Sequence, residues 1–232
     1  MLRQSWRRVT APTVLLRAHR KSDLDALARH YGTDKSSQHH CYTRLYQRHF
    51  RTRRLAVRSV LEIGVGGITS FEGFETTAGG QSLRMWRDYF PNAQIVGVDI
   101  NEKDVRGTRI HFERGDQSDS AFLQEVVRKY GPFDVVIDDG SHIGRHINAS
   151  YAALWPALKP GGIYVVEDLP VAYHPRYEGG PPGTPGTAVE LIKAQVDNAI
   201  RRNEESIGVV SFEPTVAAIH LYPEIVFFKK KA

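Results

Sequence analysis

The sequence predicts an α/β fold in which a mostly parallel sheet has helices on both faces, with a carboxy-terminal antiparallel hairpin and an amino-terminal helical cover. Between residues 59 and 166, short apolar segments alternate with longer segments of helical character, which is typical of a covered parallel sheet. After residue 187 the pattern changes to a helix followed by short apolar segments separated by prolines, which indicates strands joined by turns. At 232 residues, the chain has the size of one domain.

Five segments are expected to form the parallel strands, because each is apolar on both sides, as a sheet covered on both faces requires. These segments are 59–63, 94–99, 109–113, 133–138 and 162–166. The helices between them are expected at 82–90, 120–130 and 147–158, and a helix at 187–202 precedes strands at 207–212, 216–221 and 224–228.

Two helices are expected before the first strand, and they would form the cover. Ser22 to Asp25 has the composition of a helix cap, and Gly32 would end the helix that follows. The second helix is indicated by an apolar stripe at i, i+3, i+4, i+7 and i+8, with arginines on the other face. The stripe consists of Tyr42, Leu45, Tyr46, His49 and Phe50, and the arginines are Arg44, Arg48 and Arg51.

The stretch 173–187 contains eight residues, 179–186, that are almost entirely Gly and Pro, from which no core can be built. It is interpreted either as an inert linker or as a mobile lid loop over a site, since long loops in compact domains are often functional. The predicted organisation is a basic, flexible tail at 1–21 and a single domain at 22–232. That domain divides into a helical cover at 22–57, a cofactor-binding core at 58–169, a Gly/Pro-rich lid loop at 170–187, and a terminal helix with strands at 188–232.

The positive charge is concentrated in the first 60 residues. The chain has a net charge of +5 and a pI of about 9.3, which suggests a nucleic-acid partner. Residues 1–60, however, hold 14 Lys and Arg against 3 Asp and Glu, whereas residues 61–232 hold 17 against 23. The part that contains the expected strands is thus mildly acidic, and nucleic acid is disfavoured as a partner.

Composition also bears on the compartment. The first 21 residues hold five arginines and no acid, which is interpreted as a flexible basic tail in preference to a mitochondrial transit peptide. The single cysteine, Cys41, cannot form an internal disulfide, which fits a reducing, cytoplasmic environment. The apolar runs are only a few residues long, so we expect no membrane-spanning helix and no membrane partner.

Glycines and polar residues follow the first three expected strands, at the edge where open parallel sheets bind ligands. Gly64 and Gly66 would let the backbone approach a ligand closely, and Asp99 could accept both hydrogen bonds from a ribose diol. The segment 115–119 offers polar side chains to an adenine edge. Because Thr69 departs from the dinucleotide fingerprint, the pattern predicts a pocket for an adenosine without phosphates. A glycine-rich turn and helix caps are the alternative interpretations.

Carboxylates gather after the fourth and fifth expected strands: Asp139 follows the fourth, and Glu167 and Asp168 follow the fifth. Packed carboxylates repel one another unless a cation neutralises them, and Mg²⁺ prefers oxygen ligands. We therefore predict a magnesium site. His142, three residues after Asp139, would be a competent general base near neutral pH. Solvated caps and turns are the alternative for the acids, and a structural role is the alternative for the histidine.

These residues resemble a known family, the S-adenosylmethionine-dependent sugar O-methyltransferases of macrolide biosynthesis, such as the mycinamicin and macrocin enzymes. The chain is also similar to the mannoside 1-O-methyltransferases of mycobacterial methylmannose polysaccharide synthesis. The matching segments are 31–35, 42–43, 61–67, 80–86, 115–119, 137–142 and 166–169.

The resemblance implies a Rossmann-like class I methyltransferase fold, S-adenosylmethionine and Mg²⁺ as cofactors, and roles for individual residues. Asp139, Glu167 and Asp168 would be the magnesium ligands and His142 the general base. The cofactor-binding set would be Asp99 at the ribose, Gly64 and Gly66 at the methionine portion, Ser82 near its carboxylate, Asp116 and Gln117 near the adenine, Tyr31 and Thr33 closing the pocket, and Glu62 and Asp138 at strand ends beside it.

The function implied is methyl transfer to a hydroxyl of a sugar or oligosaccharide, with a mannoside 1-hydroxyl as one candidate. Bound Mg²⁺ would polarise the acceptor oxygen and His142 would take its proton. A homo-oligomer is expected, with a dimer favoured. Two departures limit the resemblance: the relatives can have a large amino-terminal domain, and the stretch 173–187 has no counterpart, so assembly and acceptor specificity do not carry over.

Other functions are weighed against this one. A nucleic-acid methyltransferase would use the basic head, but the fourth strand is followed by Asp138-Asp-Gly-Ser141 where base-modifying enzymes have an Asn/Asp-Pro-Pro-aromatic motif. A methyltransferase of another small hydroxylated natural product is a second alternative. A non-catalytic binding module is disfavoured because a retired site has no physical need for clustered charge, and a nicotinamide oxidoreductase is disfavoured by Thr69.

Overall fold

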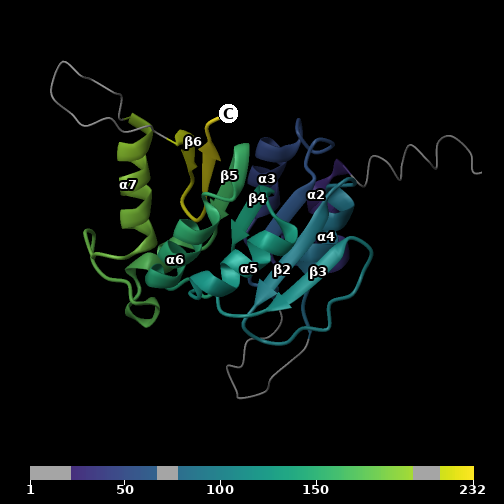
Figure 1. The fold of residues 1–232 in the computed structure, drawn as a ribbon, viewed down its shortest axis with the longest axis horizontal. Helices are drawn as coiled ribbons and strands as arrows, with labels where there is room; N and C mark the ends of the chain where they lie inside the picture. The colour runs from purple at the N-terminus through teal and green to yellow at the C-terminus, as the bar shows by residue number, and fades with distance from the viewer. Residues whose placement is uncertain (1–21, 67–77, 201–214) are drawn as a thin grey trace, which may run out of the picture.

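The computed structural model describes residues 22–66, 78–200 and 215–232. A seven-stranded sheet has the order β3-β2-β1-β4-β5-β7-β6, so that β3 and β6 lie at opposite edges (Figure 1). The first five strands pair in parallel, and β7 pairs antiparallel with both β5 and β6. The strands are β1 (Ser59–Ile63), β2 (Gln94–Asp99), β3 (Ile110–Arg114), β4 (Phe133–Asp138), β5 (Leu158–Val166), β6 (Val216–Leu221) and β7 (Val226–Lys230).

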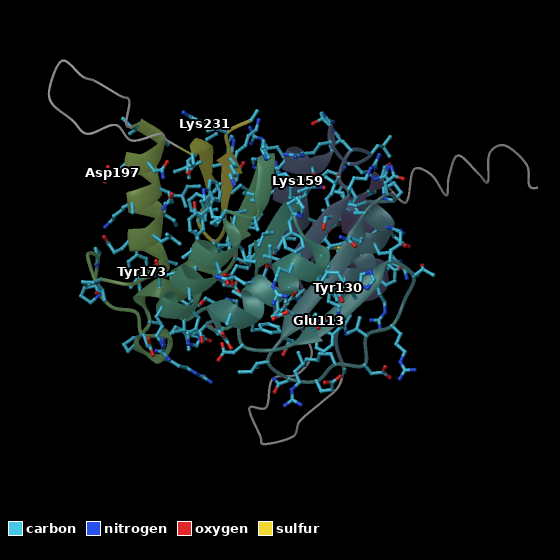
Figure 2. The ribbon with its side chains drawn as sticks, viewed as in Figure 1. Glu113, Tyr130, Lys159, Tyr173, Asp197 and Lys231 are labelled. Carbon is cyan, nitrogen blue, oxygen red and sulfur yellow. The ribbon has the colours of Figure 1, made fainter. Side chains whose placement is uncertain are left out.

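Helices cover both faces of this sheet. One face packs against α2 (Leu24–Tyr31), α3 (Tyr42–Phe50) and α4 (Gln81–Tyr89), and the other packs against α5 (Ser120–Tyr130), α6 (Gly144–Leu154) and α7 (Ala188–Ile200). The two layers of core explain why the central strands lack an alternation of apolar and polar residues: in β4, Val135 contacts the first layer and Val136 the second. Figure 2 labels Glu113 and Tyr130, whose hydrogen bond of 2.6 Å joins β3 to the end of α5.

The predicted α/β architecture and its antiparallel carboxy-terminal hairpin are confirmed, with small differences in bounds. The largest concerns the helix expected at 147–158, which runs from Gly144 to Leu154, while Leu158 already belongs to β5. Pro156 explains the early end, because proline has no N–H to continue the helix and restricts the residue before it. The basic tail and the strand expected at 207–212 lie outside the described residues.

The amino-terminal cover is part of the core. The side chain of Asp23 accepts a hydrogen bond from the Ala26 N–H at the start of α2, and Gly32, with φ of 72°, ends that helix. On α3, Tyr46 is fully buried and lies edge-on to Trp86 of α4 and Phe227 of β7. Two helices that precede the sheet in sequence are thus fixed against its interior.

Two short 3₁₀ helices, Leu169–Tyr173 and Pro175–Tyr177, follow β5 and lead into the Gly/Pro stretch. Among the described residues, no helix combines the length and the apolar character that crossing a membrane would need.

His49 should make the folded state sensitive to acid. Its Nε2 lies 3.1 Å from the Tyr222 hydroxyl, and its ring stacks on Phe227 at 4.1 Å between centroids. Burial, with His220 and Arg48 nearby, lowers the pKa of His49 from 6.5 to about 4. The unfolded chain therefore binds the proton first, and the free energy of unfolding should fall as the pH drops from 6.5 to 4.

The change His49→Phe keeps the ring and removes the titration. Because His49 is only half-buried, solvent screening limits its contribution. The variant should lose roughly 1–2 kcal/mol less of its free energy of unfolding on acidification than wild type does. Urea unfolding at pH 7, 5.5 and 4.5 measures it, with His39→Phe on the exposed loop before α3 as the control. An identical loss of stability in wild type and His49→Phe would contradict the prediction.

Candidate functional site

Two adjoining cavities open where the parallel strands end. The larger has a volume of about 340 Å³, and the smaller, of about 170 Å³, shares Asp34, Gly66 and Asp139 with it. Five residues predicted to bind the cofactor line the larger cavity, namely Gly64, Gly66, Asp99, Asp116 and Gln117. The carboxyl edge of the sheet is therefore hollowed where the sequence predicts a ligand.

Glycine is required at the first of these positions. Gly64 has φ of 82°, and a Cβ atom built there would lie 1.9 Å from the backbone oxygen of Asp139. Any side chain at Gly64 would therefore separate the loop after β1 from the loop after β4. Gly66 also has positive φ, 69°, but a Cβ there meets open space, so its constraint is the backbone conformation alone.

Asp99 is held in place by two backbone groups. Its Oδ2 accepts a hydrogen bond of 3.0 Å from the Val65 N–H, and its Oδ1 accepts one of 2.9 Å from the Asn101 N–H. Asp99 thus caps no helix, contrary to the alternative interpretation of this residue. It ties the loop after β1 to the end of β2 and lines the cavity with a fixed carboxylate.

Asp116 and Gln117 lie side by side but have different partners. Asp116 accepts hydrogen bonds from the Ser118 N–H at 2.7 Å and the Ser118 hydroxyl at 2.8 Å, which lower its pKa. Gln117 is buried; it donates to Asp138 at 3.1 Å and accepts from the Ser141 N–H at 2.7 Å. Gln117 therefore connects the loop after β3 to the loop after β4.

Asp138 lies behind the cavities and lines neither of them. Besides Gln117, the hydroxyls of Ser150 and Tyr164 donate to its carboxylate. Burial raises the pKa of Asp138 above its ordinary value. The structure thus gives this residue a place in the interior that orders the cavity wall.

Of the other four residues predicted to bind the cofactor, two line the smaller cavity, one is buried and one is partly exposed outside both cavities. Thr33 and Ser82 line the smaller cavity, and the Ser82 hydroxyl donates to Glu62 at 2.7 Å. Glu62 is fully buried, and burial raises its pKa to about 7. Tyr31 lines neither cavity; its hydroxyl donates to Asp88 at 2.8 Å.

Three residues of the predicted catalytic and metal set meet at the larger cavity. One ligand atom from each of Asp139, His142 and Asp168 lies within 4.8 Å of the other two. His142 Nε2 is 3.4 Å from Asp168 Oδ2, and the Tyr42 hydroxyl donates to Asp168 Oδ1 at 2.5 Å. His142 and Asp168 both have positive φ, 58° and 56°, a conformation that costs non-glycine residues energy and clusters at functional sites. Two carboxylates and an imidazole at this spacing fit a divalent cation.

Glu167 is next to this group but separated from it. Its side chain is only 2% exposed, its Oε2 accepts a hydrogen bond of 2.7 Å from Lys35, and its Oε1 accepts one from the Tyr46 hydroxyl. Burial and the charge of Asp139 raise the pKa of Glu167 well above its ordinary value. Lys35 thus joins Glu167 to Asp139, whereas Asp168 meets Asp139 and His142 at the larger cavity, so the predicted trio is not a single open cluster.

Lys35 is the residue of the site that sequence reasoning missed. Its side chain is 2% exposed, and its Nζ lies 2.5 Å from Asp139 Oδ2 and 2.7 Å from Glu167 Oε2. The segment 31–35 belongs to the family resemblance, which implies roles for Tyr31 and Thr33 alone. Two features of the sequence point to Lys35: the acid cluster needs a cation, and this lysine lies inside a segment that matches the family.

The Gly/Pro stretch approaches the same cavity. The ring of Tyr177 lies edge-on to His142, with 6.2 Å between centroids. Glu178 forms an ion pair with Arg145 of α6, and the Gly186 carbonyl accepts a hydrogen bond of 2.8 Å from Asn148. The stretch is therefore anchored to α6, the helix that follows His142. An inert linker would not need these contacts. Whether it moves as a lid stays a prediction.

Comparisons with known proteins identify relatives over most of this chain. No protein-family model matches the chain. It is 44% identical over 220 residues to mycinamicin VI 2''-O-methyltransferase of Micromonospora griseorubida, covering 91% of this chain and 53% of that protein. It is 41% identical over 216 residues to demethylmacrocin O-methyltransferase of Streptomyces fradiae, covering 90% and 53%. The chain thus spans about half the length of these curated relatives.

Solved structures agree with the fold and the family. MycE methyltransferase from the mycinamycin biosynthetic pathway, in complex with Mg, SAH and mycinamycin VI, is 42% identical with a TM-score of 0.80, over 91% of this chain and 55% of that one. The O-methyltransferase from Bacillus cereus in complex with SAH shares the fold, with a TM-score of 0.54 at 16% identity, over 90% and 91% of the two chains. The predicted class I methyltransferase fold is confirmed. The chain belongs to the family of S-adenosylmethionine- and magnesium-dependent sugar O-methyltransferases that includes the mycinamicin and macrocin enzymes.

Proposed function

We propose that the protein transfers the methyl group of S-adenosylmethionine to a hydroxyl of a sugar or oligosaccharide. The observation that supports this function best is the position of Asp139, His142 and Asp168 at the wall of a cavity that Asp99 and Gly64 also line. A cofactor pocket and a group able to hold a metal and take up a proton thus share one space. The carboxylates and the imidazole can then act on an acceptor beside the cofactor.

The cofactor would lie along the carboxyl edge of the sheet. Asp99 would accept hydrogen bonds from the ribose diol, since its backbone partners hold the carboxylate at the cavity wall. Gly64 and Gly66 would contact the methionine portion, with Ser82 and Thr33 at its far end in the smaller cavity. Glu62 would orient the Ser82 hydroxyl, which donates a hydrogen bond to it. In this assignment Asp116 and Gln117 flank the adenine, while Tyr31 and Asp138 support the pocket from outside it.

Asp139, Glu167 and Asp168 are proposed as the carboxylates of a magnesium site, because Mg²⁺ prefers oxygen ligands. Asp139 and Asp168 face the larger cavity, and Glu167 supports Asp139 from the buried side through Lys35. When bound, Mg²⁺ would polarise the acceptor oxygen and lower the pKa of the hydroxyl.

With oxygen ligands serving the metal, the imidazole of His142 remains available for the proton. Asp168 Oδ2 lies 3.4 Å from Nε2, close enough to orient the imidazole ring. The acceptor oxygen would form the new bond to the methyl carbon as the carbon–sulfur bond breaks, and the hydroxyl proton would pass to His142. The strained backbone of His142 and the Tyr177 ring beside it fix the direction from which the base can approach.

The acceptor is proposed as a sugar because two relatives are named as O-methyltransferases of a rhamnosyl tetracenomycin and of an L-olivosyl-oleandolide. A mannoside 1-hydroxyl and a homo-oligomeric assembly stay predictions. As a basic surface for a nucleic-acid acceptor, the exposed Arg44 and Arg48 of α3 line neither of the two cavities.

Changing His142→Ala should separate binding from catalysis. Affinity for S-adenosylhomocysteine, measured by calorimetry, should stay within a few-fold of wild type, whereas turnover should fall roughly 10²–10⁴-fold because the general base is lost. His111→Ala, on β3 outside both cavities, is the matched control and should keep its turnover. Undiminished turnover in His142→Ala would remove the base assignment.

Changing Asp99→Asn should weaken cofactor binding. A hydrogen bond to a charged group contributes about 1.5–3 kcal/mol, so the dissociation constant for S-adenosylhomocysteine should rise about tenfold or more. Asp104→Asn, an exposed acid that pairs with Arg106, controls for the loss of one negative charge. Equal affinities for the Asp99 variant and wild type would place the ribose elsewhere.

Turnover should depend on a divalent cation. Excess EDTA should abolish methyl transfer and added Mg²⁺ should restore it, while Asp168→Asn should raise the Mg²⁺ concentration needed for half-maximal rate at least tenfold, as loss of a charged ligand requires. Asp197→Asn, on the exposed side of α7 and labelled in Figure 2, is the control. Full activity of wild type in EDTA would refute the metal dependence.

A further inference from the structure

Lys35 is a buried cation to which the proposed chemistry gives no task beyond its link between Glu167 and Asp139. Its ammonium lies 2.5 Å from Asp139 Oδ2, 2.7 Å from Glu167 Oε2 and 3.7 Å from Glu62 Oε1. Three carboxylates from the ends of β1, β4 and β5 thus surround one positive charge. The ammonium donates hydrogen bonds to Asp139 and Glu167, and Glu62 is near enough to attract its charge.

The backbone around Lys35 is fixed from both sides. Gly32 closes α2 with positive φ, and the Lys35 carbonyl accepts a hydrogen bond of 3.0 Å from the Thr43 N–H at the start of α3. The Thr43 hydroxyl in turn donates to Asp25 of α2 at 2.8 Å. The side chain therefore enters the interior from a rigid connection between the two cover helices.

The contacts of Lys35 leave part of Asp139 available. Lys35 takes Oδ2, and no described residue forms a hydrogen bond with Oδ1 of Asp139, which lines both cavities. Glu167 is held more completely, with Lys35 on one oxygen and Tyr46 on the other. One lysine thus orders a carboxylate at the cavity wall and a second carboxylate directly behind it.

We propose that Lys35 is a positioning residue of the metal site: it holds Asp139 and Glu167 in the orientation that binds a divalent cation. This inference rests on the proposed magnesium dependence. Groups that hydrogen-bond metal ligands from behind orient those ligands, and their loss typically costs about 10–100-fold in metal affinity.

Charge balance allows the ammonium and the metal to be present together. Glu62, Asp139, Glu167 and Asp168 bring four negative charges when ionised, which exceeds the charge of one ammonium and one divalent cation. Removing Lys35 would leave buried carboxylates without compensation, a change that is more costly than the pair is favourable. The carboxylates would then turn away from one another, and the cation would lose its arranged ligands.

The test is metal binding without turnover. Mn²⁺ binding to the full chain, followed by the electron paramagnetic resonance signal of free Mn²⁺ and by competition with Mg²⁺, is measured without cofactor or acceptor. Lys35→Met should bind the cation about 10–100-fold more weakly than wild type. Lys35→Arg, which keeps the charge and the donors, should recover part of the affinity. Lys159, labelled in Figure 2, pairs with Asp134 at the start of β4, and Lys159→Met should bind like wild type.

The outcomes separate this inference from the proposed function. A wild-type chain that binds no Mn²⁺ would overturn the magnesium site and this role of Lys35 with it. If wild type binds Mn²⁺ and Lys35→Met binds it equally or more tightly, the magnesium site stands and the positioning role is refuted. Should Lys35→Met fail to fold, as judged by circular dichroism, Lys35→Gln keeps a donor without the charge and is read by the same criterion.

Discussion

The interaction on which the site depends is the contact of one ammonium with carboxylates from separate strands. Lys35 joins the amino-terminal cover to Asp139 and Glu167, which lie 104 and 132 residues further along the chain. Isolated carboxylates at these depths would be costly to ionise, so the acids at the ends of β1, β4 and β5 can share one region only because a cation is placed among them. The cover is consequently part of the site, because it delivers this cation and also provides Tyr42 and Tyr46.

The acids of this edge divide by burial into two groups. Glu62, Asp138 and Glu167 are buried and meet serine, tyrosine, glutamine and lysine donors of the protein. Asp99, Asp139 and Asp168 line the larger cavity. The buried group orders the loops, and the second group presents carboxylates to a ligand. The acids at the strand ends therefore serve two purposes: some hold the loops in place, and others are available to a ligand.

Two tyrosines from distant segments flank the catalytic candidates. Tyr42 of α3 donates to Asp168, and Tyr177 of the Gly/Pro stretch lies against His142. Both segments lie outside the parallel strands whose ends line the two cavities. In a fold that supports many acceptors, such additions are where specificity is built. The chain spans about half the length of these curated relatives.

The sequence by itself determined the order of strands and helices, because periodicity and turn residues act locally: β1, β2 and β4 have the predicted bounds, and Asp99, Asp139, His142 and Asp168 reach the cavity as expected from their positions after strands. Only the tertiary structure decided which acids are buried. It assigned Glu167 to Lys35 and Tyr46, Asp138 to Gln117 and Ser150, and Tyr31 to Asp88. Each of these pairings depends on desolvation and on side chains brought together across the sheet, which no local pattern encodes.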